Sequence, residues 1–352
     1  MPRRNLLLCF DAFGTLFWPK RTVAQQYGQV ARECGVTGWT EAELQSRLAA
    51  AFQDEARRHP NYGKASGLDA TQWWTNTLNA GPHRWIADTP RVQVILKTFE
   101  PFARQRPLPA DLAPKLLTRF ASSQGYHAEN NLARTLGRLK QRSSTTAFDQ
   151  VVVGVITNSD DRVPGVLSSL GLSVSPLRCG GEDRRPVRGR AYDIDFTCMS
   201  YDAGAEKPDA AIFRAAEHLC ARVVSTAGVY GVSGEGAGAR DDGEADGGAD
   251  GDADSWQKVY VGDEHAKDVV GALGAGWKPV LLDRHEKAVE IPCLEHQANQ
   301  SIADVFQRSP VVRVRSIRNL VSWVLGEGEG EGGNYSEGKD KGESESGNAL
   351  AR

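Results

Sequence analysis

Short apolar runs and longer amphipathic stretches alternate along most of the chain. Residues 6–10 and 151–156 are continuous apolar runs apart from one glycine, and shorter runs occupy 259–261 and 280–282. Continuous apolarity over a few residues is typical of a strand that is buried on both faces of a sheet. We therefore predict strands at these four places, each followed by a polar turn.

The stretches between these runs carry helical periodicity. Thr22 and Gln25 form a predicted capping box, after which apolar residues recur at helical spacing until Gly35. Thr40 and Glu43 form a second one, and the pattern stays helical to about residue 120. Beyond residue 125, predicted helices alternate with the strands. This alternation indicates a parallel sheet with right-handed crossovers.

The order of elements predicts an α/β fold, with a Rossmann-like parallel sheet and an inserted helical domain. The core is expected to comprise residues 1–18 and 125–325, and the insertion residues 19–124. Two further segments, 234–254 and 326–352, are rich in glycine and acidic residues and poor in apolar ones. Such segments cannot offset the entropy cost of ordering, so we expect both to be disordered.

The charge balance depends on these two acidic segments. The 352 residues have a formal net charge of −3. Outside the two segments, however, 38 Lys and Arg stand against 30 Asp and Glu, a charge of +8. That sign suits a small anionic partner, although net charge does not locate a site. The four arginines of residues 184–190 are too few to indicate nucleic-acid binding, and we expect none.

Several classes of protein are excluded by pattern and composition. No apolar run approaches the roughly 20 residues of a membrane span. The run at 6–10 is shorter than a signal-peptide core of about 7–15 residues. The six cysteines are scattered without Cys-x-x-Cys spacing, which indicates reduced thiols. We expect an intracellular protein, cytoplasmic, nuclear or both, that is neither secreted nor bound to a membrane; oligomeric state is left open.

Polar residues with chemical potential follow the predicted strands. Asp11 follows the first strand, Thr157 ends the second, and Asp263 follows the third, with Asp268 five residues on. Lys207 precedes a predicted helix. Ligands of open α/β sheets bind outside the carboxyl ends of the strands. Carboxylates hold Mg²⁺ through oxygen, and a carboxylate can itself be the nucleophile in phosphoryl transfer. The set therefore predicts a site for phosphate chemistry.

The order of these residues resembles the four motifs of the haloacid dehalogenase-like hydrolase superfamily. The matching residues are Asp11-x-Phe13-Gly14-Thr15, then Thr157-Asn158, then Lys207-Pro208-Asp209, then Gly262-Asp263-x4-Asp268. Residues 10–16 and 60–74 are similar to the subfamily called haloacid dehalogenase-like hydrolase domain-containing protein 3. The resemblance covers roughly residues 5–285. It implies a Rossmann-like core and a helical cap of the superfamily's first type.

The resemblance implies a Mg²⁺ site. Asp11 would be both the nucleophile and a metal ligand, and the backbone carbonyl of Phe13 would be a second ligand. Asp263 would be a third, and Asp268 would support the metal, a water or Lys207.

The resemblance also implies residues that bind the transferring group. Thr157 and Asn158 would bind phosphoryl oxygens, and Thr157 would take part in catalysis. Lys207 would steady Asp11 and the transferring charge. The substrate would be a small phosphorylated molecule, whose identity the sequence does not give.

Phe13 departs from the phosphatase pattern, which has a second Asp two residues after the nucleophile. That Asp protonates the leaving group, a role that typically contributes 10²–10⁴-fold. Three alternatives follow. The first is a phosphate-directed hydrolase whose leaving group needs little protonation or is protonated by another acid. The second is a 2-haloacid dehalogenase, which has an aromatic residue at this position, and the third is an attenuated or non-catalytic protein that binds metal or ligand. The acidic Gly262-Asp263 motif argues against the dehalogenase, because those enzymes usually lack it and need no metal.

Simpler roles remain open for some of these residues. Thr157 or Asn158 could cap a helix, and Asp268 could be an exposed carboxylate. Trp73 and Trp74 are expected to pack inside the cap.

Overall fold

The computed structural model describes residues 5–74, 94–103, 107–141, 148–181, 186–187, 189–228, 256–297 and 300–327. The predicted acidic insertion at 234–254 lies outside these residues, as does the tail at 326–352 except for its first two residues. Three of the four arginines in the basic stretch at 184–190 are also outside them.

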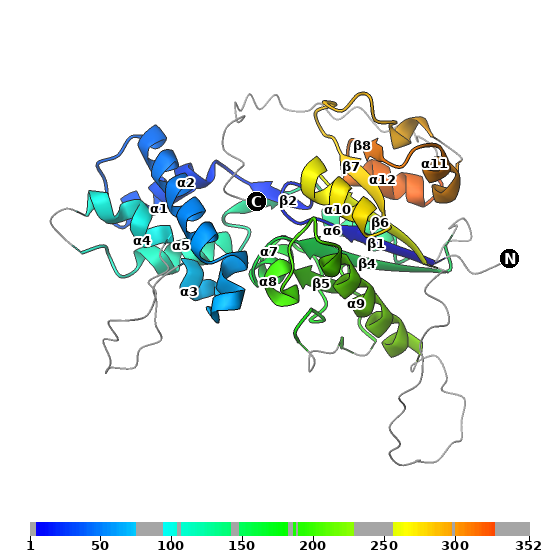
Figure 1. The fold of residues 1–352 in the computed structure, drawn as a ribbon, viewed down its shortest axis with the longest axis horizontal. Coiled ribbons are helices and arrows are strands. Elements are labelled where there is room, and N and C mark those ends of the chain that lie inside the picture. The colour runs from blue at the N-terminus through cyan, green and yellow to red at the C-terminus, as the bar shows by residue number, and fades with distance from the viewer. Residues whose placement is uncertain are drawn as a thin grey trace, which may run out of the picture.

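A six-stranded parallel sheet forms the centre of the molecule, in the order β5-β4-β1-β6-β7-β8 (Figure 1). In β1, Leu8 pairs with Val153 of β4 on one side and with Val259 of β6 on the other. The predicted α/β class with a Rossmann-like parallel sheet is confirmed. The strands are β1 (Asn5–Phe10), β4 (Gln150–Thr157), β5 (Phe196–Met199), β6 (Trp256–Gly262), β7 (Lys278–Leu282) and β8 (Val312–Val314).

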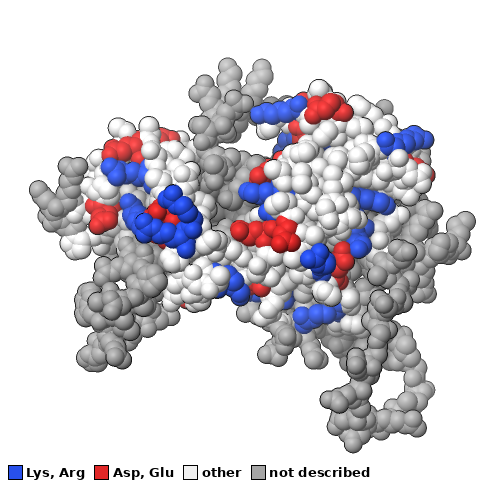
Figure 2. Space-filling view, in the orientation of Figure 1, with Lys and Arg blue, Asp and Glu red and all other residues white. Residues whose placement is uncertain are grey.

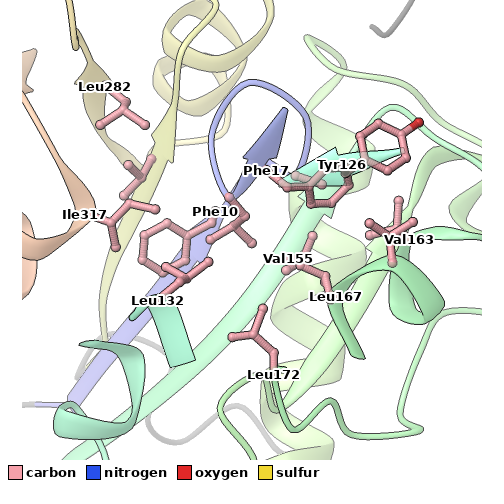
Figure 3. Close-up of a cluster of buried hydrophobic side chains, with 14 of the residues drawn as sticks. Phe10, Phe17, Tyr126, Leu132, Val155, Val163, Leu167, Leu172, Leu282 and Ile317 are labelled. Carbon is pink, nitrogen blue, oxygen red and sulfur yellow. The ribbon is translucent and has the colours of Figure 1, made fainter. Parts of the chain in front are cut away.

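Helices cover both faces of the sheet. Alternate residues of the central strand point to opposite sides, and because they are apolar, both faces must be buried. Leu6, Leu8 and Phe10 join one apolar cluster with α6, α7, α11 and α12, part of which is drawn in Figure 3. Leu7 and Cys9 join the other, with α9 and α10. The helical segments are α6 (Leu132–Arg138), α7 (Val163–Ser169), α8 (Ser200–Ala203), α9 (Ala210–Gly228), a π turn η4 (His265–Val269), α10 (Val270–Gly274), η5 (Leu294–His296), α11 (Ile302–Arg308) and α12 (Ile317–Val324).

A second group of helices lies between two short paired strands and stands to one side of the sheet in Figure 1. The predicted capping box of Thr22 and Gln25 is present, whereas Thr40 caps its helix through the Glu43 backbone. In chain order the elements are β2 (Phe17–Pro19), α1 (Val23–Glu33), α2 (Glu41–Arg58), η1 (Asn61–Ser66), α3 (Ala70–Trp74), α4 (Val94–Phe99), η2 (Glu100–Phe102), α5 (Leu112–Phe120) and β3 (Tyr126–Ala128).

The pairing of β2 with β3 brings the two ends of the helical insertion together. Phe17 is opposite Ala128, and Pro19 is opposite Tyr126. The chain therefore leaves the sheet after β1 and returns to it beside the point of departure. Within the described part of the chain, no helix has both the length and the apolar composition needed to cross a membrane.

Candidate active site

The structure brings together four residues from three segments that lie far apart in the sequence. Asp11 follows β1, Asp263 follows β6, and Lys207 precedes α9. The Nζ atom of Lys207 lies 2.9 Å from Oδ1 of Asp11 and 2.7 Å from Oδ1 of Asp268. One oxygen each of Asp11, Asp263 and Asp268 lies within 4.8 Å of the others. The result is a cluster of three carboxylates and one ammonium at the carboxyl edge of the sheet.

Lys207 is buried and held from three sides. Besides its two carboxylate neighbours, its Nζ donates a hydrogen bond to Oη of Tyr260 at 2.7 Å. The Tyr260 hydroxyl in turn donates to the carbonyl of Ile156 at 2.8 Å. Burial alone would lower the pKa of Lys207, but Asp11 and Asp268 raise it above its ordinary value. The lysine is therefore a fixed positive charge.

Asp11 is buried beside two other acids. Burial raises the pKa of Asp11 to about 6; Lys207 opposes this shift, while Asp268 and Asp263 add to it. Apart from the ion pair with Lys207, Oδ1 of Asp11 receives no well-oriented hydrogen bond from the described residues. A buried carboxylate with a single charged partner still bears much of the cost of leaving water.

The donor set fits a divalent cation. Mg²⁺ binds through oxygen, mainly of carboxylates, and keeps several waters or substrate oxygens. The cluster of Asp11, Asp263 and Asp268 supplies such oxygens, and its single lysine leaves excess negative charge. These residues can therefore hold a metal ion.

Two glycines let the carboxylates approach the backbone. Gly14 has a φ of +76°, and a Cβ built there would lie 2.4 Å from a carboxylate oxygen of Asp263. A Cβ on Gly262 would lie 2.2 Å from the carboxyl carbon of Asp268. Both are motif glycines, so the space that they leave open is part of the site.

Asp268 has both of its oxygens engaged by protein groups. Oδ1 accepts from Lys207, and Oδ2 accepts from the backbone N–H of Glu264 at 2.9 Å. It is buried, on the π turn η4, so the alternative of an exposed carboxylate is wrong. Its bonds orient Lys207 at the site.

The two residues at the end of β4 have different surroundings. Thr157 is the buried last residue of the strand. The side-chain amide of Asn158 donates to the carbonyl of Lys207 at 2.9 Å and accepts from its N–H at 2.7 Å. Neither residue is the cap of α7, because that position is held by Arg162. Asn158 instead fixes the segment that carries the lysine.

Phe13 packs among aromatic rings. Its ring centroid lies 4.7 Å from that of Phe17 and 5.7 Å from that of Tyr126, in edge-to-face contacts. Phe17 and Tyr126 lie side by side in Figure 3. Glu264, which follows Asp263 in the sequence, forms an ion pair with Lys267, and His265 is exposed on η4. The residue two positions after Asp11 is thus part of an apolar surface.

The insertion contacts the site edge through its loop η1 and helix α3. Asn61 donates to the carbonyl of Ser200 at 2.7 Å, and the Tyr62 hydroxyl lies 3.4 Å from the carbonyl of Asn158. Nε1 of Trp74 donates to Oδ2 of Asp160 at 2.7 Å. Trp74 therefore does more than pack inside the insertion.

Two residues of the site were not singled out by the sequence. Tyr260 lies within strand β6, where an aromatic residue is ordinary. Arg284 follows β7 and donates from Nη1 to the carbonyl of Gly14 at 2.6 Å and from Nη2 to that of Thr15 at 2.7 Å. Its position after a strand end was the one available signal. Tyr260 holds the Lys207 side chain, and Arg284 stabilises the loop that follows Asp11.

The sheet, its helical insertion and the order of the four motifs define an α/β protein that resembles the haloacid dehalogenase-like hydrolases. Comparison with known proteins supports this class, although no protein-family model matches the chain. An uncharacterized hydrolase of Schizosaccharomyces pombe is 29% identical over 217 residues, which are 60% of this chain and 75% of that protein.

A second relative belongs to the subfamily that the motifs resemble. Haloacid dehalogenase-like hydrolase domain-containing protein 3 of Danio rerio is 24% identical over 278 residues, 79% of this chain and 84% of that protein. A solved structure, a 2-haloacid dehalogenase from Pseudomonas syringae pv. Tomato, is 17% identical with a TM-score of 0.45, covering 91% of this chain and 97% of that one. The resemblance stated from the motifs is confirmed: the chain is similar to haloacid dehalogenase-like hydrolase domain-containing protein 3.

Proposed function

We propose that the chain is a Mg²⁺-dependent hydrolase that acts on a small phosphorylated molecule through an aspartyl phosphate on Asp11. One observation carries the proposal. A buried carboxylate beside a fixed lysine faces two further carboxylates at the carboxyl edge of the sheet. That arrangement combines a nucleophile, a positive charge and a set of oxygen ligands within a few ångströms.

The residues divide the reaction between them. An oxygen of Asp11 forms a bond to phosphorus, and the bond from phosphorus to the leaving oxygen breaks, with its electron pair going to that oxygen. Water then attacks phosphorus, and the bond from phosphorus to the Asp11 oxygen breaks with its electron pair going to that oxygen, which releases inorganic phosphate and restores the Asp11 carboxylate. Lys207 offsets the charge of Asp11 and of the phosphoryl group in both steps. Thr157 and Asn158 are the proposed contacts of the phosphoryl oxygens.

Asp11, Asp263 and the carbonyl of Phe13 would hold Mg²⁺, with Asp268 in support. When bound, the ion would neutralise phosphoryl oxygens and draw electron density from phosphorus. Gly14 and Gly262 keep the space around these carboxylates open.

Residues 19–124 are the proposed cap, and residues 1–18 and 125–325 the proposed core. The contacts of Asn61, Tyr62 and Trp74 with the core support this division. A cap over the carboxyl edge would exclude water and choose the substrate. Lys and Arg are interspersed with Asp and Glu over the described part of the face in Figure 2. Attraction for an anion would therefore come from the site itself rather than from a broad field.

Phosphate release from a panel of phosphate esters, with and without Mg²⁺, tests the proposal. Asp11→Asn should remove turnover, and Asp69→Asn, on an exposed part of the insertion, should retain it. Turnover that survives Asp11→Asn would contradict the mechanism. Chloride release from 2-chloroacids without metal would favour the dehalogenase. Stabilisation by phosphate mimics in Mg²⁺ with no turnover would favour a binding protein.

A further inference from the structure

A pocket lined mainly by aromatic rings lies between the helical insertion and the core. The core contributes Phe13, Tyr126 and Arg162 to its walls. The insertion contributes the remaining lining residues, namely Val23, Tyr27, Leu48, Phe52, Tyr62, Trp74 and Phe120. Arg162 is the one charged residue among these walls. An aromatic pocket with one guanidinium in its wall suits a ligand group that is planar and accepts hydrogen bonds.

Arg162 is held rigidly in this wall. Its Nε donates to both carboxylate oxygens of Asp160, at 2.8 and 3.0 Å, and its Nη2 lies 2.8 Å from Oδ2. The guanidinium carbon lies 4.5 Å from the centre of a Trp74 ring. Asp160 is fully buried and also accepts from Trp74. The side chain is therefore a preorganised donor whose charge Asp160 largely balances.

One nitrogen of Arg162 is left over from this arrangement. Nε and Nη2 are engaged by Asp160, and Nη1 has no hydrogen-bond partner among the described residues. A guanidinium offers five N–H donors, so Nη1 retains donors for a ligand. These donors belong to a residue that lines the pocket.

Two residues that line the pocket are connected with the proposed reaction site. Phe13 follows Asp11 by two residues and lines the pocket. Tyr62 also lines it, and its hydroxyl lies 3.4 Å from the carbonyl of Asn158, next to Thr157. In phosphoryl transfer the attacking and leaving oxygens lie roughly in line on opposite sides of phosphorus. With Asp11 attacking, the leaving oxygen lies on the far side of phosphorus, and the insertion contacts the core at Ser200 and at Asn158, beside Thr157.

From these contacts we infer that the pocket binds the leaving group, and that Arg162 stabilises a planar oxyanion as it departs. This inference rests on the proposed function. The leaving oxygen takes the electron pair of the breaking P–O bond and departs as an anion, so no proton donor is needed at position 13. The substrate class is a phosphate whose leaving group is a stable planar anion, either an acyl phosphate or an aryl phosphate.

A kinetic comparison of leaving groups tests the inference in the full chain with Mg²⁺. The substrates are acetyl phosphate, phenyl phosphate and glycerol 3-phosphate. Arg162→Gln should lower kcat/KM about 10- to 100-fold for acetyl or phenyl phosphate, or both, and less than 3-fold for glycerol 3-phosphate. The more affected ester identifies the class. An equal loss on all three would overturn the inference, because it would show a structural role only.

Two further variants guard against unfolding and misreading. Arg162→Lys keeps a positive charge beside buried Asp160, so the variant should fold. Its ammonium cannot bind Asp160 and also place a donor where Nη1 lies, so it should show the same selective loss. Arg178→Gln breaks another arginine–aspartate pair, with Asp202, outside the pocket. It should leave the ratio between substrates unchanged, and a shifted ratio would contradict the assignment.

Binding of unreactive phosphonates separates this inference from the proposed function. Phosphonoacetate, which carries a planar carboxylate in place of the leaving group, should bind the parent at least 10-fold tighter than methylphosphonate, and Arg162→Gln should reduce that preference. This readout does not depend on turnover, so it stands even if no phosphate ester is hydrolysed. Two results together would overturn the pocket assignment: equal binding of the two phosphonates by the parent, and an equal loss of kcat/KM on all three substrates in Arg162→Gln. The role of Asp11 would remain intact.

Discussion

Lys207 meets Asp11 at 2.9 Å inside the protein, although 196 positions of sequence separate the two residues. The same ammonium meets Asp268 at 2.7 Å. One lysine therefore compensates two buried carboxylates, and removing it leaves both without their shared partner.

Lys207→Met should destabilise the metal-free protein by about 3–5 kcal/mol, because breaking a buried pair leaves uncompensated charge. Urea unfolding measures the loss. Mg²⁺ should recover part of it, since the cation supplies positive charge at the same carboxylates. Lys258→Met removes a more exposed pair with Glu217 and should cost less than about 1 kcal/mol. Equal losses in the two variants would contradict the burial argument.

Gly14→Ala tests whether this glycine is needed to leave space for the Asp263 carboxylate or only to adopt a positive φ. Gly14 and Gly35 have nearly the same φ, +76° and +79°, but a Cβ meets Asp263 only at Gly14. Each change should cost roughly 1–2 kcal/mol from the left-handed backbone. Gly14→Ala alone should also weaken Mg²⁺ binding, measured by calorimetry. If Gly35→Ala weakens Mg²⁺ binding equally, the collision with Asp263 is irrelevant.

Trp74→Phe should change how the insertion meets the core. It removes the donor to buried Asp160 while keeping an aromatic ring, at a cost of about 1–3 kcal/mol. Trp73→Phe removes a comparable bond to the carbonyl of His59, within the insertion. Steady-state kinetics should show a raised KM for Trp74→Phe and an unchanged KM for Trp73→Phe. A raised KM in both would mean that the contact with Asp160 has no special role.

Phe13→Asp supplies the missing acid directly. Turnover of glycerol 3-phosphate should rise by about 10²-fold, the lower end of general-acid effects. Acetyl phosphate should gain little, since its leaving group departs as an anion. Phe13→Leu removes the ring without adding an acid and should give no gain. A loss on every substrate in Phe13→Asp, with folding verified by circular dichroism, would show that position 13 does not face the leaving oxygen.

The sequence predicted the strands whose interiors are uniformly apolar. β1 and β4 were found because continuous apolar runs mark buried parallel strands. β5 and β8 were missed: Thr197 interrupts the first, and Arg313 interrupts the second, where it is buried and lies 3.7 Å from Asp283. Tertiary contacts make these polar residues compatible with a sheet, and such contacts are not visible in local pattern.

The same limit applies to the site. Asp11, Lys207 and Asp263 stand at strand or helix ends, where local pattern marks them. Tyr260 supports Lys207 from within a strand, and Arg162 lines a pocket that exists only when the insertion packs on the core. Their roles depend on long-range contacts, so only the structure could place them.

The most direct measurement of the central claim is the location of the covalent intermediate. The full chain is mixed with acetyl phosphate and Mg²⁺, quenched in acid and reduced with borohydride, which converts an aspartyl phosphate to homoserine. Peptide mass spectrometry then locates the reduced residue. The account predicts homoserine at position 11, only when both Mg²⁺ and substrate are present. Phosphate release with Asp11 unmodified, or with the reduced residue elsewhere, would contradict it.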